Sequence, residues 1–183
     1  MISGDRRLFG IAAEGLAKAF GPVDLTSQVI PFDFTDYYDK QMGGPLCRSF
    51  VSFREPFDPG RIAEAKVFTN RLEAVLAALS ADGPPRPINL DPGYVAESKL
   101  VLASMKNFSH RIYLGQGVYA EITLLYRKGR WEPLGWTFPD YASGRYDAFL
   151  TAVRDALRAG GVKVRPARGP ARFRQAGRED DSK

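Results

Sequence analysis

The strongest structural signal in this sequence is a β-hairpin between residues 110 and 126. Two runs of alternating side chains, residues 110–114 and 118–126, are joined by Gly115-Gln116-Gly117. Short glycine-rich loops between two such runs are typical of hairpins. Any fold for this chain must therefore include an antiparallel strand pair here.

The register of this hairpin predicts specific cross-strand pairs. A three-residue loop places residue 112 opposite residue 120. Arg111 then lies opposite Glu121, and Tyr113 lies opposite Tyr119, on one face. The other face carries the apolar residues that we expect in the core: Ile112, Leu114, Val118, Ala120, Ile122 and Leu124. Loop length and the alternation of side chains along each strand thus predict an Arg–Glu ion pair beside the tyrosines.

Apolar residues at three- and four-residue spacing predict helices over residues 5–20, 58–79 and 145–159. Asp58 supplies an N-cap for the second helix, and a proline follows it at the first helical position. The expected buried stripe of that helix is Ile62, Ala65, Phe68, Leu72, Val75, Leu76 and Leu79. Beside the stripe, Lys66, Asn70 and Glu73 share one edge, which is either solvated or the wall of a pocket.

The remaining segments predict short strands. Residues 46–54 and 87–90 alternate or are apolar, and Asp91-Pro92-Gly93-Tyr94 suits a type II turn. Residues 95–105 fit a helix at first and a strand later, and periodicity does not separate the two. Three helices with about five or six mostly antiparallel strands predict an α+β domain, with the helices packed on a single sheet.

Length and charge predict one folded domain and a tail. The chain has 183 residues and a net charge of +5, of which +4 lies in residues 161–183. We expect residues 1–160 to form a single α+β domain and residues 161–183 to be a basic, disordered tail. The nearly neutral domain shows no electrostatic footprint for nucleic acid, although the tail could add weak, salt-sensitive attraction to RNA or a membrane.

Composition also favours a cytoplasmic protein. The longest apolar run, residues 74–79, is far shorter than the roughly 20 residues that span a bilayer. Charged residues 5–7 stand where the apolar part of a secretory signal would be. Cys47 is the single cysteine, so no internal disulfide can form.

Candidate functional residues concentrate between positions 89 and 121. The candidate catalytic residues are His110, Asp91 and Glu121, and the candidate ligand-binding residues are Lys66, Asn89, Lys99, Lys106 and Arg111. Lysine and arginine hold phosphate or carboxylate groups, and histidine can move a proton near neutral pH. We predict a small anionic or polar ligand in a pocket near Asp91 and the hairpin.

The sequence leaves the reaction open, including whether the protein is an enzyme. It contains no nucleophile elbow, phosphate loop or metal-ligand spacing, so we assign no cofactor and no metal ligand. Turn chemistry is sufficient to explain Asp91, and His110 could simply end the core face of its strand.

A non-catalytic protein-interaction or assembly module is the alternative function. Aromatic side chains suit partner surfaces as well as pockets, and the candidates are Tyr37, Tyr38, Tyr94, Tyr113, Tyr119 and Trp136. Convergence of the charged candidates on one concave site would favour the ligand-binding alternative, whereas scatter over a flat face would favour interaction.

Several unusual strings carry a family resemblance: PFDFTDYY, NLDPGY, KLVLAS, HRIYLGQGVYAEITL and WTFPDY. Through them the chain resembles the uncharacterised bacterial family called domain of unknown function 4416, from Met1 to about Arg158. The resemblance implies no established activity. Some relatives bear a GTP-binding label, but this sequence lacks the G-x-x-x-x-G-K-[ST] loop that cradles phosphates.

The chain also departs from its relatives. Gln41, Met105 and Phe138 stand where relatives usually have Glu, Thr and Tyr, which argues against chemistry at these positions. Relatives place a short apolar strand ahead of the segment that matches residues 2–5. Met1 is therefore either the true start or an internal methionine that follows a missing core strand. In the second case, we expect the first helix to cover a sheet with an exposed or vacant position.

Overall fold

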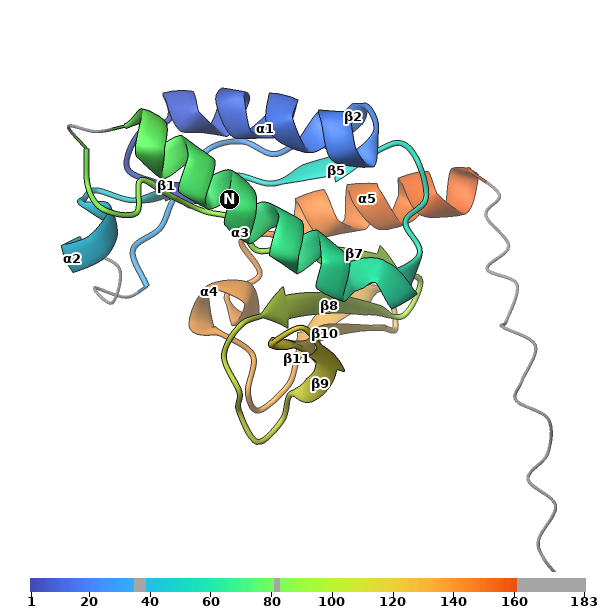
Figure 1. Ribbon diagram of the computed structural model, residues 1–183. Helices are drawn as coiled ribbons and strands as arrows, with labels where there is room; N and C mark the ends of the chain where they lie inside the picture. Colours follow the sequence, from blue (N-terminus) through green and yellow to red (C-terminus); the bar gives the residue numbers. More distant parts are fainter. Residues whose placement is uncertain (35–38, 81–82, 161–183) are drawn as a thin grey trace, which may run out of the picture.

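The computed structural model describes residues 1–34, 39–80 and 83–160 of the chain. The expected tail at 161–183 and the candidate residues Tyr37 and Tyr38 lie outside these ranges. Figure 1 shows the elements along the chain. In order they are β1 (Ile2–Ser3), α1 (Arg7–Phe20), β2 (Val23–Thr26), β3 (Ile30–Pro31), α2 (Asp39–Met42), β4 (Cys47–Arg48), β5 (Val51–Phe53), the 3₁₀ helix η1 (Pro59–Arg61), α3 (Ile62–Leu79), β6 (Ile88–Asn89), β7 (Gly93–Ala96), β8 (Lys99–Ser104), β9 (Ile112–Gly115), β10 (Val118–Arg127), β11 (Arg130–Pro133), α4 (Pro139–Ala142) and α5 (Asp147–Ala159).

The α+β class is confirmed, but the expectation of a single sheet is wrong. The described strands form three sheets, with orders β3-β4-β1-β6, β11-β10-β8-β7 and β2-β5, and β9 pairs with β10 beside the second. Every pairing among the described strands is antiparallel. The strand expected over residues 46–54 is divided, because Cys47–Arg48 joins the four-stranded sheet and Val51–Phe53 joins the two-stranded one.

The four-stranded sheet is built from strands of only two residues. Its strand β1 pairs with β4 on one side and β6 on the other, so a strand does precede the first helix. Helices α1 and α3 pack beside it and supply most of a core cluster that contains Leu8, Phe9, Ala12, Cys47, Leu76, Ile88 and Leu90. The expected vacant sheet position beside α1 stays a prediction.

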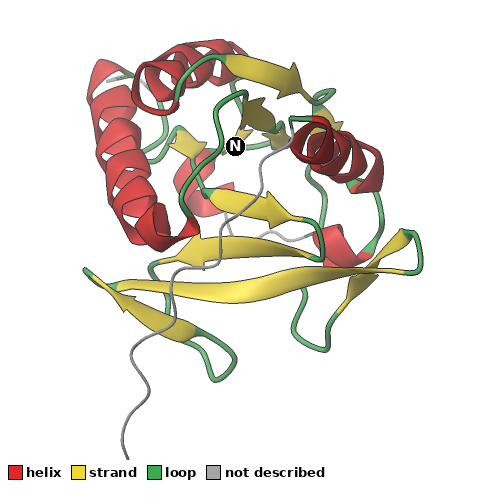
Figure 2. Cartoon of the chain, turned by 90° about the vertical axis from the view of Figure 1, so that its right-hand side faces the viewer, coloured by secondary structure: helices red, strands yellow, loops and turns green. Residues whose placement is uncertain are grey.

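The five-stranded sheet lies below the long helices in Figure 2. Residues 95–105 form no helix, because β7 and β8 make a hairpin that pairs Ala96 with Lys99. Val101 of β8 packs against α3, while its neighbour Leu100 packs with α4 and α5. Successive residues of a strand point to opposite faces, so helices contact both faces of this sheet.

Helix α3 joins the two large sheets, and this position changes its buried face. It contacts β6 of the four-stranded sheet and β8 and β10 of the five-stranded sheet. Asp58 accepts from Gly60 N at 2.9 Å and so caps the 3₁₀ turn that leads into α3, whereas the N-cap of α3 itself is Arg61. The predicted stripe is partly wrong, because Val75 and Leu79 are exposed whereas Lys66 and Thr69 are buried.

The hairpin register is confirmed, but its core face is not. Tyr113 pairs with Tyr119, and Ile112 pairs with Ala120. Ile112 and Leu114 nevertheless expose 71% and 42% of their surface. The core cluster beneath α3 takes in Val118 and Ala120 of β10 and no residue of β9, because β9 runs beyond the reach of that helix.

Candidate functional site

The segment that enters the candidate site is not the expected type II turn. Such a turn requires a positive φ at its third residue, and Gly93 has none. Gly93 instead begins β7, where a Cβ atom would lie 2.5 Å from the carbonyl oxygen of Val101. Pro92 O accepts a hydrogen bond from Ala103 N at 3.0 Å. Only glycine permits this approach, which brings Asp91 beside the end of β8.

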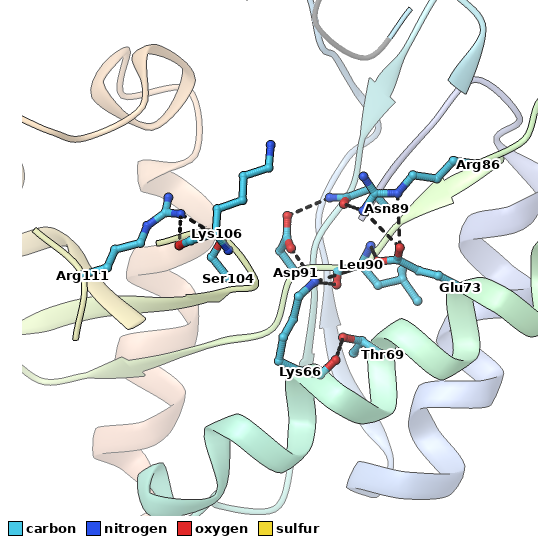
Figure 3. A network of polar contacts seen from close by, with 10 residues as sticks. All are labelled: Lys66, Thr69, Glu73, Arg86, Asn89, Leu90, Asp91, Ser104, Lys106 and Arg111. Carbon is cyan, nitrogen blue, oxygen red and sulfur yellow. Dashed lines mark hydrogen bonds and ion pairs between the residues drawn. The ribbon is translucent and has the colours of Figure 1, made fainter. Parts of the chain in front are cut away.

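Asp91 is held by two buried side chains. Lys66 Nζ donates to Asp91 Oδ1 at 2.7 Å and to the carbonyl of Leu90 at 2.9 Å. Asn89 Nδ2 donates to Asp91 Oδ2 at 2.7 Å. The side chain of Lys66 is 3% exposed, whereas that of Asp91 is 40% exposed. The Asp91 side chain is therefore fixed by Lys66 and Asn89 (Figure 3), yet it remains partly exposed to solvent.

Two further charged residues complete this group. Glu73 accepts from Leu90 N at 2.7 Å and from Arg86 Nη2 at 3.0 Å, and Arg86 also donates to Asn89 Oδ1. We call Lys66, Glu73, Arg86, Asn89 and Asp91 the Asp91 network. The edge of α3 that carries Lys66 and Glu73 is therefore not a solvated edge. Arg86 was not among the candidate residues from the sequence, yet it binds both Glu73 and Asn89.

The charges of this network act on Asp91. Burial alone would raise the pKa of Asp91. The Lys66 ammonium and the hydrogen bonds from Lys66 and Asn89 outweigh that effect, and they lower the pKa below its ordinary value. Asp91 is thus ionised at neutral pH and is a permanent hydrogen-bond acceptor.

The Arg–Glu pair predicted from the hairpin register is confirmed. Arg111 Nε donates to Glu121 Oε2 at 2.7 Å, and Arg111 Nη1 donates to Ser104 Oγ at 2.9 Å. His110 Nε2 lies 2.9 Å from the same Glu121 oxygen. We call Ser104, His110, Arg111 and Glu121 the Glu121 network. The other oxygen, Glu121 Oε1, is buried and has no hydrogen-bond partner among the described residues.

His110 lies in an aromatic stack and does not end the core face of its strand. Its ring stacks on Trp136 at 5.3 Å between centroids and 9° between planes, and Phe108 lies 5.8 Å away. Trp136 is fixed in turn, because its Nε1 donates to the carbonyl of Ile122 at 2.9 Å. The imidazole is therefore held by a carboxylate at one nitrogen and by the stacked ring of Trp136 at one face.

The structure brings most predicted site residues together in two neighbouring networks. Lys66, Asn89 and Asp91 belong to the first, and His110, Arg111 and Glu121 belong to the second. The Pro92–Ala103 hydrogen bond joins the residue after Asp91 to the residue before Ser104. Figure 3 shows Asp91 on one side of this junction and Ser104 with Arg111 on the other. The Lys106 carbonyl accepts from Arg111 Nη1 at 2.9 Å. Lys99 lies apart, at the far end of β8 opposite Ala96 and Leu125.

Comparison with known families agrees with the resemblance seen in the sequence. Residues 1–157 match the model of a family described as Domain of unknown function (DUF4416). The chain belongs to this family. No curated protein and no solved structure matches it. The matched residues include both networks, and the description of the DUF4416 family assigns no activity.

A third charged cluster in this DUF4416 chain escaped the sequence reasoning. Arg48 Nη1 donates to Asp140 Oδ2, and the hydroxyl of Tyr146 donates to the same oxygen at 3.3 Å. The guanidinium lies 4.6 Å from the ring centroid of Phe32 and 5.0 Å from that of Tyr141. Burial raises the pKa of Tyr146 to about 12 and that of Tyr141 further. Both phenols are therefore neutral donors at physiological pH.

This cluster adjoins the Asp91 network. Ile2 of β1 pairs with Arg48 on one side and with Asn89 on the other, so the three side chains share one face of the four-stranded sheet. No signal in the sequence joins Arg48 to Asp140, because 92 positions separate them.

Two hollows on the surface of this DUF4416 domain are lined by residues outside both networks. The larger, about 560 Å³, is lined by residues that include Gly4, Leu8, Met42 and Pro84. The smaller, about 220 Å³, lies beside Phe57 and other residues of the α1–α3 contact. Neither is lined by a residue of the Asp91 or Glu121 network.

Within residues 1–34, 39–80 and 83–160, no three His, Cys, Asp or Glu side chains gather closely enough to hold a metal ion. In the same ranges, no helix combines the length and apolar character needed to cross a bilayer.

Proposed function

We propose that this DUF4416 domain binds a small polar ligand at the open side of Asp91, between residues 89–92 and the 110–126 hairpin. The observation that supports this proposal is that the Asp91 side chain is both fixed by its neighbours and partly exposed to solvent. Buried Lys66 and Asn89 fix both of its oxygens, yet 40% of the side chain is exposed. A charged acceptor that is immobilised before a ligand arrives loses little entropy on binding.

The charge balance favours a polar ligand over a strongly anionic one. Lys66 and Arg111 are each paired with a carboxylate, and their side chains are only 3% and 4% exposed. An added phosphate would have to compete with Asp91 and Glu121 for these cations. Hydroxyl or ammonium groups, in contrast, can donate directly to Asp91. Polyols, sugars and small amines are therefore the ligand classes that fit best.

The location in the cell belongs to the same proposal. One cysteine in 183 residues is typical of a chain that does not depend on disulfides. We place the binding in the cytoplasm on that ground.

A thermal-shift screen tests the proposal. The panel contains polyols, sugars, small amines, carboxylates, sugar phosphates and divalent metals. A ligand at 100 times its Kd stabilises the fold by roughly 2.7 kcal/mol. We expect a hit among the donor-rich compounds with the wild-type chain, and loss of that shift in Asp91→Asn, measured against that variant's own melting temperature.

Asp155→Asn is the matched control, because Asp155 is a carboxylate on the surface of α5 with an exposed side chain. It should keep the wild-type shift. A panel without any hit, or a hit that Asp91→Asn retains in full, would refute the assignment of the site.

A further inference from the structure

The hairpin that contributes to the Glu121 network leaves an open sheet edge. Strand β9 pairs with β10, and no other described strand pairs with it. Figure 1 shows β9 at the lower end of the molecule, away from α1 and α5. The backbone groups on its outer side therefore face solvent, where they can accept another strand.

This edge carries neither charge nor proline, which are two of the features that usually prevent strand addition. Natural edge strands carry charges, prolines or bulges that block pairing. Residues 112–115 are Ile-Tyr-Leu-Gly, with no charge and no proline. The nearest charge, on Arg111, is directed inward to Glu121, and its side chain is only 4% exposed. No charge on β9 therefore repels an incoming strand, although its pairing with β10 is irregular at Leu114, between the pairs Tyr113–Tyr119 and Gly115–Val118.

Apolar side chains continue outward from this edge. Ile112, Tyr113 and Leu114 are 71%, 59% and 42% exposed. The exposed rings of Phe108 and Phe138 lie 5.5 Å and 5.9 Å from the Arg111 guanidinium. The whole patch, which we call the β9 surface, is Met105, Phe108, Ile112, Tyr113, Leu114, Trp136 and Phe138.

The area of the β9 surface suits a protein partner. Seven large side chains that each expose about half of their roughly 200 Å² offer about 700 Å². A standard interface buries roughly 800 Å² on each partner. The surface is therefore large enough to supply most of one side of a stable interface. It also gives the interaction alternative, first drawn from the tyrosines and tryptophans, a defined location.

We propose that the occupant is a second copy of this chain, which pairs its own β9 antiparallel to the first across a two-fold axis. Identical antiparallel edges are self-complementary, and one such contact closes the assembly because it uses both open edges. A pairing centred on Tyr113 places Ile112 opposite Leu114 of the second copy. It also places Arg111 opposite Gly115, so no like charges meet.

Sedimentation velocity of the full chain at micromolar concentration tests the dimer. We expect twice the mass of the 20.3 kDa chain. In Ile112→Lys/Leu114→Lys each lysine of one copy faces a lysine of the other, and this variant should sediment as a monomer. Circular dichroism and thermal unfolding should remain close to those of the wild type, because both replaced side chains are exposed.

Two variants separate this pairing from a general loss of apolar surface. Ile112→Lys/Leu114→Glu places opposite charges across the same register and should restore the dimer. Ile11→Lys makes the same kind of change at an exposed position of α1 and should stay dimeric.

Three outcomes would overturn the proposal. The first is a wild-type chain that remains monomeric at every concentration tested, which would leave the β9 surface to a different partner. The second is a dimer that persists in Ile112→Lys/Leu114→Lys, which would place the interface elsewhere. The third is a Lys/Glu variant that is as monomeric as the Lys/Lys variant, which would refute the register.

Discussion

The Lys66–Asp91 ion pair predicts unequal effects when either partner is removed. Lys66 is 3% exposed, whereas Asp91 is 40% exposed. Asp91→Asn leaves a buried ammonium whose remaining partners are the Leu90 carbonyl and Glu73, 4.0 Å away. Lys66→Met leaves a carboxylate that water can reach. The more exposed residue should therefore be the more costly one to replace.

The magnitudes follow from the same contacts. Loss of one partner of a buried ion pair costs about 3–5 kcal/mol, and we expect about 3 kcal/mol for Asp91→Asn because Glu73 offsets part of the stranded charge. For Lys66→Met we expect about 1–2 kcal/mol, the cost of leaving the buried Leu90 carbonyl without a donor. The double variant holds no stranded charge, so it should cost about 2 kcal/mol, with a coupling energy of about 2 kcal/mol.

Urea unfolding at neutral pH, followed by circular dichroism, measures these free energies if the slope with denaturant stays constant. Asp155→Asn, on the surface of α5, should change stability by less than about 0.5 kcal/mol. Equal costs for Lys66→Met and Asp91→Asn would refute the predicted inequality. Costs that simply add in the double variant would show that the pair is not coupled.

Three other predictions concern acid stability, the close approach at β7 and the buried face of α3. Because the pKa of Asp91 is lowered on folding, its contribution to stability is present above about pH 4 and is lost as the pH falls further. Asp91→Asn should therefore flatten the acid limb of a stability–pH curve measured by urea unfolding. Gly93→Ala should cost about 2–3 kcal/mol in the same assay, since its methyl group would lie 2.5 Å from a carbonyl oxygen of β8. Gly135→Ala, which meets nothing within 4 Å, should cost less than about 1 kcal/mol. Leu76→Ala should cost about 2–5 kcal/mol and Leu79→Ala less than about 0.5 kcal/mol, and equal losses would contradict the burial of the first and the exposure of the second.

The hairpin shows what the sequence can determine by itself. The pairing of Arg111 with Glu121 depends only on loop length and on the alternation of side chains along a strand. Both are local, and the structure confirms the pair. The exposure of Ile112 was not predictable in this way, because it depends on how far the first residues of α3, Ile62 and Ala63, reach across the sheet.

Helix α3 shows where sequence reasoning stops. Its apolar spacing predicts one straight stripe, but the helix packs against two sheets at once. Lys66 is consequently buried and Leu79 is exposed. The sequence left two alternatives open for Lys66, a solvated residue or part of a pocket wall. Its hydrogen bonds to Leu90 and Asp91 decide between them, and these depend on the tertiary structure.

Long-range partners were the hardest to predict. The Asp91–Tyr94 segment carries a strong turn pattern, yet Gly93 is required by the approach of β7 to β8. The Arg48–Asp140 pair joins residues 92 positions apart, and neither belongs to a motif. The first feature depends on how closely β7 approaches β8 within their shared sheet, and the second depends on how α4 packs against β4. No local pattern encodes either one.

The two-residue strands of the four-stranded sheet have a consequence for the order of folding. Ile2 pairs with both Arg48 and Asn89, so this sheet forms only after two long chain segments have closed into loops. Strands this short contribute little before their neighbours are in place. Residues 93–133, in contrast, supply a complete five-stranded sheet from one continuous segment, through local hairpins that form quickly. We therefore expect the five-stranded sheet to appear first, and the Asp91 network to be among the last parts of the molecule to acquire its final geometry.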